Sequence, residues 1–95
     1  MKNRKSIKNQ LKTLIKEYHL EKELSVDLII HWIAEENEPD AMKANYDYQN
    51  KWMKYFIQET DIDKFNEILE IFTDAWNYFP HKSLNGLSPI ETINK

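Results

Sequence analysis

Apolar residues recur along this chain at the three- and four-residue spacing of amphipathic helices, and no run alternates apolar and polar residues as a strand would. A first stripe predicts a helix over about residues 6–20. A second stripe begins after Ser25, a good N-cap, and is apolar enough to predict a helix at the centre of a bundle. The first stripe consists of Ile7, Leu11, Leu14, Ile15 and Tyr18.

The second half of the chain predicts three more helices. Proline suits the first turn of a helix and disfavours helix in the residue before it, so Pro39 is expected to begin a helix that runs to about residue 59. Thr60-Asp61 caps a fourth helix, which we expect to end before Pro80 because proline cannot continue a helix interior. Ser88-Pro89-Ile90-Glu91 is a capping box and predicts a short helix over about residues 89–94.

Composition favours the same all-α interpretation. The chain has a single glycine, three prolines and 13% aromatic residues, whereas sheets joined by tight turns usually need more glycine. We therefore expect one domain over residues 1–95, folded as a compact bundle of four helices plus a short C-terminal helix. Residues 1–5 are expected to form a flexible basic arm.

Several kinds of chemistry have no support in the sequence. One glycine leaves no phosphate-cradling loop, and the absence of cysteine removes disulfides, thiolate metal sites and cysteine nucleophiles. Asp27, His31 and Glu35 share one helix face and offer a metal three side chains, but a solvated face with paired charges is the preferred interpretation. We expect no enzyme activity, no cofactor and no metal.

Location and membrane contact follow from the apolar runs. No run is long enough to cross a bilayer, and the basic N-terminal residues precede no apolar signal region. The sequence therefore predicts a cytoplasmic protein without a membrane partner.

Two features suggest a protein partner. The predicted third helix carries three tyrosines and a tryptophan, which are too many for one helix to hide in so small a domain, and exposed tyrosine and tryptophan are favoured interface anchors. The junction before this helix concentrates acids, which suggests an electronegative patch for a basic partner. Self-association as a homodimer is another way to bury surplus rings. The interaction candidates are Tyr46, Tyr48, Trp52, Tyr55, Glu35, Glu36 and Glu38.

Charge is unevenly spread and suggests a second kind of partner. Residues 1–22 hold seven basic residues against two acids, whereas residues 23–75 hold thirteen acids against four lysines. A basic helix on an acidic body is a candidate for phosphate contacts with a nucleic acid, although the net charge of −3 opposes such binding. The nucleic-acid candidates are Lys2, Arg4, Lys5, Lys8, Lys12, Lys16 and Lys82.

The tail carries a distinctive run of residues. An aromatic-Asn pair at a helix end is followed by Pro80-His81, Ser83-Leu84, Gly86, Ser88-Pro89 and Glu91. With the helix before it, this pattern, over residues 60–91, resembles the C-terminal helix and tail of integrase-type transposases.

The resemblance implies a mobile-element origin and a helix-and-tail unit that packs or docks. It does not imply catalysis, because the family's two aspartates belong to a preceding mixed sheet that this chain lacks, and two-metal chemistry needs all its carboxylates together. Phe79 also stands where the family usually has arginine. The sequence thus favours a small non-catalytic protein that acts by protein–protein interaction, with a nucleic-acid-binding accessory as the alternative.

Overall fold

The protein is described by a computed structural model that covers residues 2–93. Its elements are α1 (Arg4–Glu17), α2 (Val26–Glu35), α3 (Ala41–Met53), α4 (Ile62–Tyr78), the 3-10 turn η1 (Lys82–Leu84) and α5 (Pro89–Ile93). Within residues 2–93 there is no β-strand, only an isolated antiparallel bridge between His81 and Leu87. The predicted all-α bundle of four helices plus a short fifth is therefore confirmed.

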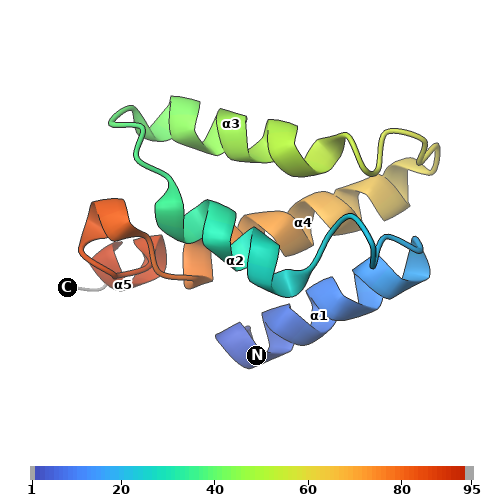
Figure 1. Cartoon of the computed structure of the whole chain (residues 1–95), viewed down its shortest axis with the longest axis horizontal. Coiled ribbons are helices and arrows are strands. Elements are labelled where there is room, and N and C mark those ends of the chain that lie inside the picture. The colour runs from blue at the N-terminus through green and yellow to red at the C-terminus, as the bar shows by residue number, and fades with distance from the viewer. Residues whose placement is uncertain (1, 94–95) are drawn as a thin grey trace.

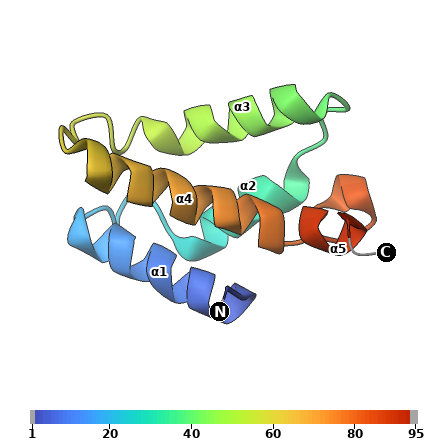
Figure 2. The same ribbon diagram turned by 180° about the vertical axis from the view of Figure 1, so that it is seen from behind.

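The helices are arranged in three levels. Figure 1 shows α2 and α4 in the middle, with α3 along one side and α1 along the other. Seen from behind in Figure 2, α4 runs along the middle of the molecule, and the tail with α5 continues beyond its C-terminal end. No helix among the described residues is long and apolar enough to cross a membrane.

Stacked aromatic rings join α3 to α4. The rings of Trp52 and Phe72 lie 4.3 Å apart at an interplanar angle of 8°, and the ring of Phe56 packs edge-on to Phe72 at 5.7 Å. The buried Tyr48 hydroxyl donates a hydrogen bond of 2.8 Å to the carbonyl of Phe72. Because large rings fill the space between them, the α3 and α4 backbones stay further apart than those of α1 and α4.

Smaller side chains join α1 to the rest of the bundle. Ile7, Leu11, Leu14 and Ile15 are all buried, as the first apolar stripe predicts. Aliphatic side chains let two helices approach closely, and α1 lies close along α4. At the solvent-exposed border of this contact, Lys64 and Glu17 form an ion pair of 2.8 Å.

The start of α1 differs from the prediction of a flexible arm over residues 1–5. Asn3 is the N-cap, since its side chain accepts a 2.8 Å hydrogen bond from the Ser6 amide, while the Ser6 hydroxyl accepts one of 3.1 Å from the Asn3 amide. Such a reciprocal cap fixes the first turn, so Arg4 and Lys5 belong to the helix. Met1 lies outside the described residues, as does Asn94 at the predicted end of the last helix.

The bounds of α3 also differ from the prediction. The Asp40 carboxylate accepts hydrogen bonds from the amides of residues 42 and 43, so Asp40 is the N-cap and Pro39 stays outside the helix. At the other end, the amides of Tyr55 and Phe56 bond to carbonyls three residues earlier. This tighter turn places the Phe56 ring in the core and ends α3 at Met53 rather than near residue 59.

Truncation of the stacked tryptophan tests this description of the core. We expect Trp52→Ala to lower the free energy of unfolding by about 3–5 kcal/mol, because it removes a fully buried ring. Tyr46→Ala, on the exposed side of the same helix, is the matched control and should cost much less. Urea unfolding followed by circular dichroism measures both. Equal losses would contradict the assignment of Trp52 to the core.

Candidate functional site

The aromatic interaction candidates divide between core and surface. Trp52 and Tyr48 are 0% and 3% exposed, and Tyr55 is half-buried against the core. Only Tyr46, at 64% exposure, remains on the surface. The prediction that this row forms an exposed interface is therefore wrong for Tyr48 and Trp52, because rings on α4 cover them.

The acidic junction between α2 and α3 is matched by cations and donors of the same chain. Glu35 pairs with Lys82 at 2.5 Å, and this hydrogen bond lowers the pKa of Glu35. Glu36 accepts a 3.3 Å hydrogen bond from the Ser83 hydroxyl. Together these contacts tie the end of α2 to η1.

The third acid of the junction is also engaged. Glu38 lies 3.5 Å from the Lys43 ammonium, one turn into α3. The expected patch for a basic partner at Glu35, Glu36 and Glu38 is thus not a free anionic surface. Its carboxylates hold neighbouring elements in place.

The tail motif forms a closed structural corner. The buried His81 ring donates from Nε2 to the Trp76 carbonyl at 2.8 Å and packs edge-on against the Trp76 ring. Asn85 and Gly86 both have positive φ, as a turn there requires. Ser88 and Glu91 form the predicted capping box through hydrogen bonds of 2.9 and 3.3 Å.

Three of the basic nucleic-acid candidates are held by acids of the chain. Lys2 lies 3.2 Å from Asp74 and 3.3 Å from Glu70, and the hydrogen bond to Asp74 raises the pKa of Lys2. Arg4 pairs with Glu91 at 2.8 Å and also donates to the Tyr78 carbonyl. Lys82 pairs with Glu35, as described above.

The other four candidates form a stripe along α1. Lys5, Lys8, Lys12 and Lys16 follow at intervals of three, four and four residues, which places them on one helix face. All are exposed, and none forms an ion pair within residues 2–93. We call these residues the lysine stripe. The structure thus separates four free cations from three that stabilise the fold.

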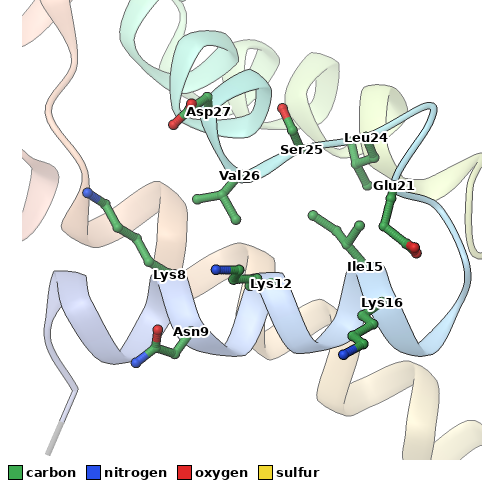
Figure 3. Close-up of a pocket in the computed structure, with 10 residues that line it drawn as sticks. All are labelled: Lys8, Asn9, Lys12, Ile15, Lys16, Glu21, Leu24, Ser25, Val26 and Asp27. Carbon is green, nitrogen blue, oxygen red and sulfur yellow. The ribbon is translucent and has the colours of Figure 1, made fainter.

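A groove of about 680 Å³ runs beside the lysine stripe, between α1 and α2. Figure 3 shows Ile15 and Val26 pointing toward one another from the two helices, with Lys8, Lys12 and Lys16 along the α1 edge. Asp27 lies in the first turn of α2, and Glu21 lies in the loop that joins the two helices. We call this the α1–α2 groove; its lining includes Lys8, Lys12, Lys16, Ile15, Leu24, Val26, Glu21 and Asp27.

Apolar and charged atoms in the α1–α2 groove have different roles. Ile15 and Leu24 are buried at its floor, whereas Val26 is half-exposed. Lysine stems add aliphatic surface to the wall while their ammonium groups stay in water. The groove thus offers apolar contact beside a row of cations. The sequence showed the lysines but not the groove, because Val26 belongs to the same apolar stripe as core residues.

The Asp27, His31 and Glu35 face gives no metal site. Residues 2–93 hold no group of three or more His, Cys, Asp or Glu side chains that is arranged to bind a metal ion. On this face Glu35 is paired with Lys82, and Asp27 borders the α1–α2 groove.

Comparison with known proteins adds no family. No protein-family model matches the chain, and neither a curated protein nor a solved structure matches it. The similarity of residues 60–91 to integrase-type transposases stays a prediction from the motif.

A partly buried hydrogen bond fixes the end of α1 beyond the groove. The Tyr18 hydroxyl donates to the Glu59 carboxylate, and its ring packs edge-on to Phe56 at 5.1 Å. Burial, followed by this hydrogen bond, raises the pKa of Tyr18 to about 12. The same bond lowers the pKa of Glu59.

The raised tyrosine pKa predicts a loss of stability at alkaline pH. The pKa of a tyrosine in an unfolded chain is about 10, whereas that of Tyr18 in the folded protein is about 12. The contribution of Tyr18 to folding stability is therefore complete below pH 10 and is lost as the pH rises toward 12. Urea unfolding at a series of pH values should show Tyr18→Phe with a shallower alkaline decline than wild type. Tyr46→Phe is the control. Parallel declines in wild type and Tyr18→Phe would contradict the assignment.

Proposed function

We propose that this protein is a non-catalytic, cytoplasmic interaction protein whose α1–α2 groove binds an acidic amphipathic helix of a partner protein. The observation that carries the proposal is the lysine stripe, unpaired within the described chain, beside an apolar groove. The mobile-element origin suggested by the tail is compatible with this role and is likewise a proposal.

The unpaired lysines indicate that the partner surface is negatively charged. Lys2, Arg4 and Lys82 are matched by nearby carboxylates, but the lysine stripe is not. Lysines three or four residues apart on one helix face repel one another. An acidic partner therefore relieves this repulsion as well as attracting the lysines. Electrostatic complementarity of this kind chiefly sets the association rate and the choice of partner.

The spacing of the lysines favours a helical partner. Lys8, Lys12 and Lys16 recur every four residues, which is about 6 Å along a helix. A second helix with acids every fourth residue presents charges at the same interval. Its neighbouring apolar side chains then lie over Val26 and the lysine stems, as in helix-in-groove recognition.

The groove fits a protein better than a nucleic acid. A sugar-phosphate backbone gains little from apolar residues such as Ile15 and Val26, and the carboxylates of Glu21 and Asp27 in the lining repel phosphates. A peptide helix uses both the apolar floor and the lysines. The chain's net charge of −3 also disfavours nonspecific binding to nucleic acid.

A synthetic helical peptide with glutamate at every fourth position and leucine on the adjacent face tests the proposal. We expect binding that weakens with salt, and that falls about fivefold to tenfold in Lys12→Glu through loss of one favourable pair and gain of one repulsion. Val26→Asn should also weaken binding, because it removes apolar contact without changing charge. Fluorescence anisotropy of the labelled peptide measures all three.

Two controls accompany this experiment. Lys51→Glu makes the same charge change at an exposed lysine of α3, outside the α1–α2 groove, and should leave the affinity nearly unchanged. A peptide with lysine in place of every glutamate should not bind. If Lys12→Glu bound as tightly as wild type, or if Lys51→Glu weakened binding equally, the groove would not be the site.

Nucleic-acid binding is the second candidate function, and the unpaired lysine stripe is the observation that favours it. If the four lysines contact phosphates, the affinity for generic duplex DNA should fall with salt at a log–log slope of about −3 to −4. Lys8→Gln with Lys12→Gln should make this slope shallower by about two, and Val26→Asn should leave it unchanged. Anisotropy with labelled DNA at low and physiological salt measures the slope. Absence of binding at low salt would exclude this function.

A further inference from the structure

A second apolar surface lies at the turn between α3 and α4. Ile57 and Ile62 are 80% and 75% exposed, and with Met53 and Phe65 they line a hollow of about 540 Å³. Large aliphatic side chains gathered on the surface of a small domain mark interaction sites more often than single exposed ones do. We call this the turn surface.

Acidic residues stand at and next to the turn surface. Glu59 lies in its lining and Asp61 and Asp63 flank Ile62 in the sequence. None of the three forms an ion pair within residues 2–93. Glu59 accepts a hydrogen bond from Tyr18, and Asp61 caps α4. Lys54 is the one lysine in the lining.

The charges of the turn surface are complementary to those of the α1–α2 groove. The groove is lined by three lysines of α1, by Glu21 of the α1–α2 loop and by Asp27 of α2. The turn surface has Glu59 and Lys54 in its lining, and two more acids, Asp61 and Asp63, stand next to the exposed Ile62 in the sequence. These acids can therefore face the lysine stripe while Lys54 faces Asp27, and apolar side chains meet between them.

We propose that the turn surface of a second copy of this chain docks in the α1–α2 groove. This inference rests on the proposed function, since it names an occupant for the same groove. Figure 1 places the α3–α4 turn at one end of the molecule. The groove lies elsewhere, between α1 and α2. After a single contact the pair therefore keeps one free groove, on one copy, and one free turn surface, on the other.

This geometry determines the kind of assembly. The contact joins two different surfaces, so it is heterologous, and such contacts grow into rings or open chains rather than stopping at a twofold dimer. The contact combines rim charges with a modest apolar area, so association should be weak and should decrease with salt.

Sedimentation velocity of the full chain over a range of concentrations tests the proposal. We expect the wild-type sedimentation coefficient to rise with protein concentration and to rise less in high salt. Ile62→Asp should remove this rise by spoiling the turn surface. Lys8→Glu with Lys12→Glu should remove it by reversing the charge of the groove. All of these side chains are exposed, so the variants should fold, which circular dichroism checks.

Mixing the two variants supplies the decisive observation. The Ile62→Asp chain keeps an intact groove and the Lys8→Glu/Lys12→Glu chain keeps an intact turn surface, so the mixture should form a complex of two chains that grows no further. Met42→Asp is the matched control, because it places the same charge on another exposed apolar residue in a first helical turn, and it should associate like wild type.

Contrary outcomes separate this inference from the proposed function. A wild-type chain that stays monomeric at all concentrations, while its groove still binds the acidic peptide, would overturn self-docking and leave the proposed function standing. Association that is lost in Ile62→Asp but survives Lys8→Glu/Lys12→Glu would also overturn it, because the occupant would then sit elsewhere. Failure of the acidic peptide to bind would count against the proposed function itself.

Discussion

Contact between the rings of Trp52 and Phe72 is the interaction on which the rest of this fold depends. It fixes α3 on α4, and the Phe56 ring extends the same cluster to Tyr18 at the end of α1. Trp52 Nε1 is buried with no hydrogen-bond partner among residues 2–93. An unsatisfied buried donor costs about 1–3 kcal/mol, so the apolar and stacking contacts of this ring must outweigh that cost.

Formation of this aromatic cluster also determines which side chains of the α3–α4 turn stay exposed. Turning the chain sharply after Met53 brings Phe56 into the core and leaves Ile57 outside, and the hydrogen bond from Tyr18 to Glu59 then holds the turn. The turn surface is thus a by-product of core formation at one end of the bundle. On the opposite side of α4, close aliphatic packing orients α1 so that its lysine stripe borders the groove with α2.

Features that depend on local spacing could be predicted from the sequence. The helical stripes and the capping box at Ser88 are properties of residues a few positions apart. The aromatic row of α3 was misassigned because its partners, Phe72 and Trp76, lie on another helix. A row of rings on one helix does not indicate whether water or a second row covers it.

The same distinction applies to charge. Periodicity alone placed the lysine stripe on one face of α1, but only the fold shows that Lys2 and Arg4 meet acids from residues 70–91 and that the stripe does not. The basic N-terminal region is thus two sets of cations with different roles. Its first residues close the bundle against α4 and the tail, and the next four remain available.

Amide chemical shifts followed by NMR during titration with the acidic amphipathic peptide locate the contact on the chain residue by residue. If the peptide binds in the α1–α2 groove, the largest changes follow α1 from Lys8 to Lys16 and the start of α2 at Val26, with α3 nearly unaffected. Changes centred instead on α3 or on the tail, or no changes at a saturating peptide concentration, would contradict binding in this groove.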